Sequence, residues 1–313
     1  MDPLRILAEL NGFFSRSEAL QAGFDDNAIR RSIKGKLWTR VRPGAYTFTD
    51  LWAGMDEEAR HLATAHAAVR KLGRSVALSH VSAALHHGMT VWGADLSKVH
   101  VTRLDGGAGR TEAGVVHHEG FSLDTDVMDE DGHLIMRPAR AALETGTQVS
   151  TEATVALLDN GLNTERFSAQ EMDRTFALMH RWPKTLHLQF AVRFADGRAE
   201  SVGESRSRYL CYAHGLPAPE LQFHVYDAAG RLLGISDMAW IDQHLLGEFD
   251  GKIKYGRLLK AGEEPGDAVF REKQREDALR EATGFSMVRL TWRDLYRGPE
   301  TAERIRRLMR RAA

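Results

Sequence analysis

The sequence predicts an α+β multidomain protein with a central mixed sheet flanked by helices in its C-terminal part. Its 313 residues are enough to bury two or three cores, and 43% of them are hydrophobic and 27% charged, as in globular chains. Helical and strand patterns follow one another in three compositional blocks. Residues 245–255, LLGEFDGKIKY, alternate charged and apolar side chains, which indicates a strand with two different faces.

Composition excludes several classes of protein. The net charge of −1 means that affinity for nucleic acid has to come from local patches. The single cysteine, Cys211, excludes an intramolecular disulfide and a cysteine-based zinc cluster, and it suits a reducing compartment. The first residues, MDPLRILAELNGFF, lack the pattern of a signal peptide, and no apolar run approaches the roughly 20 residues that span a bilayer. We therefore predict a cytoplasmic protein with no membrane partner.

The first block, residues 1–50, predicts two short capped helices followed by a β-hairpin that turns at Pro43-Gly44. Ile29 and Ile33 share one face of the second helix, so this face packs on the core. Basic side chains are left on the outside of the helix and the hairpin: Arg30, Arg31, Lys34, Arg40 and Arg42. This is the arrangement of a winged helix-turn-helix, whose second helix enters the major groove of double-stranded DNA while the wing holds phosphate. The alternative is a small helical cap with a solvated basic face.

The second block, residues 51–195, predicts an α/β middle region. Its strand patterns are KVHVTRL and GVVHHEG, and its helices are expected at Glu57–Lys71, Ser79–His87, Thr151–Leu162 and Ala169–His180. The boundary to the third block is expected within residues 180–205, because this segment contains Pro183, Gly197 and Gly203.

Two histidine pairs in the middle region, His86-His87 and His117-His118, invite a metal interpretation. Adjacent side chains on a helix or strand point apart, and no carboxylate lies at metal spacing nearby in the sequence. We therefore expect ordinary packing and surface histidines with no metal role.

The predicted winged helix and the stretches ALSHVSAALHHG and IMRPARAALETG lie within residues 1–165. Together they resemble the AbiEi-type antitoxins of type IV toxin–antitoxin systems. It implies a DNA-binding regulator or antitoxin-like module, with a cognate toxin as a second partner.

The third block, residues 196–313, predicts a mixed sheet with flanking helices. The expected order is helix, three strands, helix, strand and helix, at Ser205–His214, Leu221–Tyr226, Leu232–Asp242, Leu245–Tyr255, Ala268–Thr283, Ser286–Trp292 and Glu300–Arg311.

Acidic residues of this block are expected to meet. Asp237 lies in the apolar strand GISDMAWI, where a carboxylate is costly unless it is paired or bound to metal. A short turn at Asp242–His244 makes a hairpin that brings Asp237 beside Glu248 and Asp250, and Glu204 opens a helix that reaches the same cluster. Such carboxylates repel one another without a cation, and Mg²⁺ or Mn²⁺ takes oxygen ligands of this kind and activates water against a phosphodiester.

Four stretches, spread over residues 200–297, resemble the PD-(D/E)XK nucleases in the branch related to very-short-patch-repair endonucleases. They are GESRSRYL, GISDMAWID, GEFDGKIKY and FREKQREDALREATGFSMVRLTWRDL. The resemblance implies a restriction-endonuclease-like domain in which Asp237 and Glu248 are the principal metal ligands. It also implies Asp250 as an adjacent ligand and Glu204 as a supporting acid of the catalytic site.

The resemblance leaves the lysine and the primary acid open. A strict D/E-x-K match uses Asp250 and Lys252, whereas the family's Glu-x-Asp-Gly run uses Glu248 and Asp250. Either Lys252 or Lys254 is then the catalytic lysine, which stabilises the phosphate or orients the water. On the following helix, Arg275 and its neighbours either face this site or form a solvated surface.

We predict from these features a DNA-binding protein that hydrolyses DNA phosphodiester bonds as a metal-dependent endonuclease, in defence, toxin–antitoxin function or DNA repair. The main alternative is a non-enzymatic AbiEi-type antitoxin or transcriptional repressor with a degenerate nuclease fold. Weaker alternatives are RNA as the substrate and an ordinary strand of surface ion pairs, which leaves Asp237 unexplained.

Overall fold

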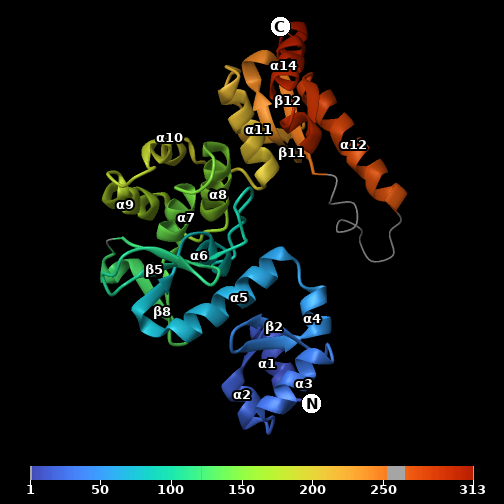
Figure 1. Cartoon of the computed structure of the whole chain (residues 1–313). Helices are drawn as coiled ribbons and strands as arrows, with labels where there is room; N and C mark the ends of the chain where they lie inside the picture. Colours follow the sequence, from blue (N-terminus) through green and yellow to red (C-terminus); the bar gives the residue numbers. More distant parts are fainter. Residues whose placement is uncertain (1, 121, 252–264, 313) are drawn as a thin grey trace. The chain divides into compact units, whose positions relative to one another are not determined.

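A computed structural model describes the chain over residues 2–120, 122–251 and 265–312. The predicted α+β class is confirmed, because helices and three separate sheets alternate along the chain (Figure 1). Every helix of these ranges is too short or too polar to cross a membrane.

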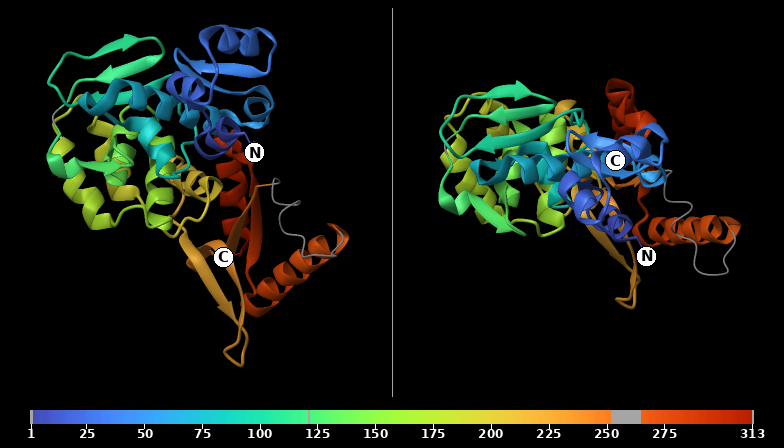
Figure 2. Two further views of the ribbon diagram at one scale, coloured as in Figure 1. Left: turned by 90° about the horizontal axis from the view of Figure 1, so that it is seen from below. Right: turned by 60° about the horizontal axis from the view of Figure 1, so that its bottom comes forward.

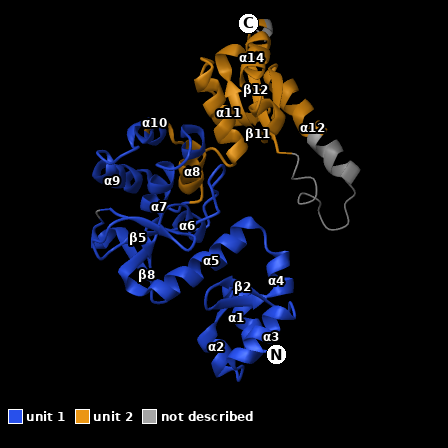
Figure 3. Ribbon diagram, in the orientation of Figure 1, with its two compact units in different colours: residues 1–154, 165–192 blue, residues 155–164, 193–313 orange. Residues whose placement is uncertain are grey.

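The chain divides into two compact units (Figure 3). The first comprises residues 1–154 and 165–192, and the second comprises residues 155–164 and 193–313. A three-stranded and a six-stranded sheet belong to the first unit, and a four-stranded sheet belongs to the second.

The first unit begins with four short helices and a small antiparallel sheet of order β1-β3-β2. Its elements are α1 (Pro3–Asn11), β1 (Phe14–Ser15), α2 (Arg16–Gln21), α3 (Asp26–Lys34), β2 (Trp38–Arg42), β3 (Ala45–Phe48) and α4 (Thr49–Gly54). Ser15 starts α2 through a capping box with Glu18, and Asp25 caps α3. Phe14 and Trp38 are buried between the helices and the sheet, with ring centroids 4.8 Å apart. The side chains of Ser15 and Asp25 therefore start these two helices.

The rest of the first unit surrounds a mixed sheet of order β6-β7-β5-β4-β9-β8. Its strands are β4 (Val76–Leu78), β5 (Val99–Arg103), β6 (Arg110–Glu112), β7 (Val115–His118), β8 (Val127–Glu130) and β9 (His133–Met136). Its helices are α5 (Glu57–Leu72), α6 (His80–His86), α7 (Pro138–Gly146), α9 (Ala169–Met179) and α10 (Leu186–Phe194). Helix α8 (Thr151–Asn163) starts in the first unit, and most of it belongs to the second. Helix α10 occupies the segment in which we expected only a boundary, because Leu188, Ala191 and Val192 recur at helical spacing and are buried.

The second unit has the element order expected from the sequence. Its elements are α11 (Val202–Ala213), β10 (Glu220–Tyr226), β11 (Leu232–Trp240), β12 (Leu245–Asp250), α12 (Pro265–Thr283), β13 (Ser286–Thr291), α13 (Trp292–Leu295) and α14 (Gly298–Ala312). The sheet order is β10-β11-β12-β13. The first three strands are antiparallel, and their first turn lies at the tip of a long hairpin (Figure 2). Strand β13 runs parallel to β12, as a crossover through α12 requires.

The two faces of this sheet carry different layers (Figure 1). Leu245 and the Phe249 ring pack with residues of α11 and α14 on one face, and Leu246 packs with Leu279 of α12 on the other. Because side chains alternate along a strand, Glu248 and Asp250 lie on the face of α12.

Gly203 fixes the approach of α11 to β12. A Cβ atom at this position would lie 1.9 Å from the Phe249 ring. We expect Gly203→Ala to destabilise the second unit by about 1–3 kcal/mol, because either the ring or the helix has to move. Urea unfolding followed by tryptophan fluorescence measures the loss. Gly54→Ala is the matched control, since a Cβ there meets nothing within 4 Å, and an equal loss in both variants would contradict the packing explanation.

Candidate functional site

Asp237 stands where the main-chain pairing of β11 and β12 ends. The register runs from Trp240↔Leu245 to Met238↔Gly247. The next residue outward, Asp237, accepts a hydrogen bond at Oδ2 from the backbone N–H of Phe249, with an O–N distance of 2.8 Å. Phe249 separates Glu248 from Asp250 in the sequence, so the carboxylate of Asp237 lies beside the stretch of β12 that carries both acids.

Glu248 is buried with 5% of its surface exposed, and two arginines bind it. Its Oε1 accepts from Arg275 Nη2 at 2.7 Å, and its Oε2 lies 3.4 Å from Arg289 Nη2. Arg289 also binds Glu276 at 3.1 Å. A buried carboxylate needs such compensation. Of the two orientations considered for Arg275, the structure has the one that faces the acidic residues.

Glu204 is buried in the first turn of α11, where the helix dipole favours a negative charge. Its Oε1 accepts from Ser201 Oγ at 2.7 Å. Its Oε2 accepts from the backbone N–H of Glu200 at 2.9 Å and from Gln222 Nε2 at 3.1 Å. These contacts hold Glu204 against the start of α11 and against β10. The two candidate lysines, Lys252 and Lys254, lie outside the described residues.

Two other groups of side chains have the geometry of a metal site. Within the described ranges, three ligand atoms all within 4.8 Å of one another occur in two groups: His80, His100 and His118, and His86, His87 and Glu130. The candidate acids Glu204, Asp237, Glu248 and Asp250 belong to neither group.

Our expectation that no carboxylate accompanies His86-His87 is wrong. Glu130 Oε2 lies 2.7 Å from His86 Nε2, although the two residues are 44 positions apart in the sequence. The expectation considered only residues close together in the sequence. Folding of the sheet creates the contact between His86 and Glu130.

The basic residues of the N-terminal region divide into exposed and covered side chains. Arg30, Arg31, Lys34 and Arg40 are exposed, and none of them forms an ion pair in the described part of the chain. Arg42 is half-buried instead, and its Nη2 lies 3.3 Å from the carbonyl oxygen of Ala113. This burial lowers the pKa of Arg42. The exposed basic surface therefore consists of the outer face of α3 and Arg40 of β2.

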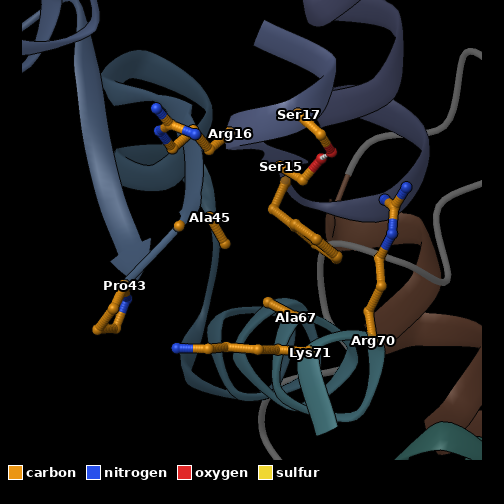
Figure 4. Close-up of a pocket in the computed structure, with 10 residues that line it drawn as sticks. Ser15, Arg16, Ser17, Pro43, Ala45, Ala67, Arg70 and Lys71 are labelled. Atoms are coloured by element: carbon orange, nitrogen blue, oxygen red, sulfur yellow. Dashed lines mark hydrogen bonds between the residues drawn. The ribbon is translucent and has the colours of Figure 1, made fainter. Parts of the chain in front are cut away.

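A cleft of about 500 Å³ lies between the turn Pro43-Gly44, the start of α2, and α5 (Figure 4). Arg16, Arg70 and Lys71 line it. Arg16 pairs with an aspartate at 2.6 Å and Arg70 with a glutamate at 2.7 Å, whereas Lys71 extends along the cleft toward the turn (Figure 4). Because carboxylates balance two of the three cations, the cleft is weakly basic.

Comparisons with known proteins give relatives without an assigned function. No protein-family model matches the chain. Over 249 residues the chain is 31% identical to two Mycobacterium tuberculosis sequences, uncharacterized protein MT2308 of strain CDC 1551 / Oshkosh and uncharacterized protein Rv2248 of strain ATCC 25618 / H37Rv. Each alignment covers 77% of this chain and 88% of the relative. The crystal structure of the Rv2827c protein from M. tuberculosis aligns with 65% of this chain and 78% of its own, at 15% identity and a TM-score of 0.38, which is too low to carry an argument.

Proposed function

The chain belongs to the family of these two uncharacterized mycobacterial proteins, and we propose that it is a DNA-binding protein with a Mg²⁺-dependent endonuclease site. The observation that carries the proposal is the organisation of the second unit. A helix precedes three antiparallel strands, and a crossover helix leads to a fourth strand parallel to the third. Asp237 on the second strand lies beside the acids of the third strand, as the PD-(D/E)XK resemblance implies.

Asp237, Glu248 and Asp250 suit Mg²⁺ because their carboxylates offer oxygen atoms close to one stretch of β12. Mg²⁺ keeps several waters and needs only one or two carboxylates from the protein. Asp237, Glu248 and Asp250 are the candidate donors, and Arg275 and Arg289 also bind Glu248. When bound, the ion lowers the pKa of water and neutralises charge on the phosphate.

The chain's own residues supply orientation and charge. The Phe249 N–H holds one oxygen of Asp237 and fixes this carboxylate beside β12. Arg275 and Arg289 put positive charge next to the acids, where it would stabilise a phosphodiester. We propose Asp237, Glu248 and Asp250 as the acids around the ion, and Glu248 also holds these two arginines.

A winged helix at the N-terminus would deliver the site to DNA. The order of its elements and the sheet order β1-β3-β2 support this proposal, as do the exposed cations of α3. Arg40 is the wing residue available for phosphate, because Arg42 is turned toward Ala113.

Replacing Arg30, Arg31 and Lys34 together by alanine is expected to weaken DNA binding and to reduce its dependence on salt. Each lost phosphate contact lowers the slope of log K against log salt by roughly 0.9. Fluorescence anisotropy with a labelled duplex at several salt concentrations measures both effects. The control replaces Arg74, Arg231 and Arg310, which removes the same charge from arginines paired with their own acids. Equal loss of binding in both triple variants would exclude a specific role for α3.

The activity is tested by incubating the full chain with double-stranded DNA or RNA in Mg²⁺, Mn²⁺ or EDTA. We expect cleavage of DNA with either metal and none in EDTA. Cleavage of RNA but not of DNA would show that RNA is the substrate. Intact DNA under every condition would contradict the endonuclease.

A second candidate function is a non-enzymatic antitoxin or repressor whose C-terminal sheet only binds. The observation in its favour is the pairing of Glu248 with Arg275 and Arg289. These arginines balance the buried negative charge of Glu248 without a metal ion. Under this candidate, the variants of α3 still lose DNA binding, but no metal produces cleavage.

A further inference from the structure

His86, His87 and Glu130 come together at the end of α6 and the end of β8, in the first unit. One ligand atom of each lies within 4.8 Å of the other two, and all three residues are half-buried. His86 is the last residue of α6 and His87 is its C-cap, so the chain leaves the helix between the two imidazoles. Their ring centroids are 5.3 Å apart.

The hydrogen bond of His87 leaves one of its nitrogen atoms available. Its Nε2 lies 2.7 Å from the carbonyl oxygen of Met136, which can only accept, so Nε2 carries the proton. Nδ1 of the neutral ring then holds a lone pair. Histidine ligands of metals commonly donate their second N–H to a backbone carbonyl in this way.

His86 has a partner at each ring nitrogen. Its Nε2 lies 2.7 Å from Glu130 Oε2, and its Nδ1 lies 2.9 Å from His66 Nε2 on α5. If the proton of His86 moves from Nε2 to Nδ1, Nε2 gains a lone pair beside the carboxylate. His66 can accept the hydrogen bond from this proton, because a neutral imidazole has one acceptor nitrogen.

We propose that His86, His87 and Glu130 bind a transition-metal ion of the Zn²⁺ class. Two imidazole nitrogens and one carboxylate oxygen are a ligand set that suits Zn²⁺, whereas Mg²⁺ prefers oxygen alone. His66 is a positioning residue that orients His86. His133 is the cross-strand partner of Glu130 and lies on the same face of the hairpin, so the fourth position is filled by His133 or by water.

The ion would join α6 to the β8–β9 hairpin and stabilise the first unit, because it binds the folded chain and not the unfolded one. This proposal depends on no part of the nuclease proposal, which concerns the second unit.

The second histidine group provides the matched control. His80 and His118 stack face to face, with ring centroids 3.6 Å apart and an angle of 16° between their planes. His118 Nε2 lies 2.8 Å from His100 Nδ1, so these two nitrogens already share a hydrogen bond. His80 is also held by Ser79 Oγ at 3.0 Å from its Nδ1. We therefore expect no ion at this group.

The test is a titration of the metal-free full chain, without a histidine tag, with ZnCl₂ in a calorimeter. Co²⁺ absorbance reports the ligand geometry. We expect one Zn²⁺ per chain and a higher melting temperature with Zn²⁺. His87→Ala and Glu130→Gln should each weaken binding by more than about 10-fold, and His66→Ala by roughly 10- to 100-fold. Circular dichroism checks that each variant is folded.

The control is His118→Ala, which should bind Zn²⁺ as the wild type does. Three results would overturn the proposal: no Zn²⁺ binding by the wild type, unchanged affinity in both His87→Ala and Glu130→Gln, or loss of binding in His118→Ala. The absence of nuclease activity would not change the interpretation of these Zn²⁺-binding results.

Discussion

Asp237→Asn is expected to reduce metal-dependent DNA cleavage by about 10³-fold or more, while DNA binding persists. The substitution keeps the size of the side chain and removes one negative charge from the proposed ion site. Loss of a group that supports water activation and charge stabilisation has effects of this size. The rate of plasmid nicking or of cleavage of a labelled duplex in excess Mg²⁺ measures the change, and fluorescence anisotropy measures binding.

Asp242→Asn is the matched control for this experiment. Asp242 is exposed in the turn between β11 and β12, so the same chemical change is made in the same unit away from the acidic residues. We expect it to cleave at the rate of the wild type. An Asp237→Asn variant that cleaves equally well would exclude this site even if the protein is an enzyme. If all three proteins leave DNA intact with every metal, the antitoxin or repressor is favoured.

Asp159→Asn is expected to lower the free energy of unfolding by about 3–5 kcal/mol, which is typical of a broken buried ion pair. Asp159 of α8 is fully buried and accepts from Arg208 Nη2 at 2.9 and 2.8 Å and from the backbone N–H of Asp196 at 2.7 Å. The asparagine leaves the buried guanidinium of Arg208 without its counter-charge. Chemical denaturation of the full chain measures the loss.

Two further variants make this prediction specific. Asp227→Asn breaks an exposed pair with Arg231 and should cost far less, because solvent screens that pair. Asp159→Leu combined with Arg208→Met should recover most of the stability, because an apolar pair needs no compensation. A double variant as unstable as Asp159→Asn would show that packing of α8, rather than unpaired charge, causes the loss.

Much of the architecture follows from short-range patterns in the sequence. Capping residues start α2 and α3, alternation marks the strand that begins at Leu245, and an apolar run around Asp237 marks the strand before it. Such signals are local, because hydrogen bonds and side-chain periodicity within an element depend on neighbouring residues. They were sufficient to predict the α+β class and the order of elements in the second unit.

The composition of the candidate sites depends on contacts between distant parts of the chain. Glu248 meets Arg275 and Arg289 only because β13 returns parallel to β12 and α12 lies over them. His86 meets Glu130 only because α6 ends beside the β8–β9 hairpin. Strand register and helix packing decide these contacts, and neither leaves a short-range pattern. The sequence alone thus determined the elements and the candidate acids, whereas the tertiary structure decided which charges and ligands meet, because side chains interact through space and not along the chain.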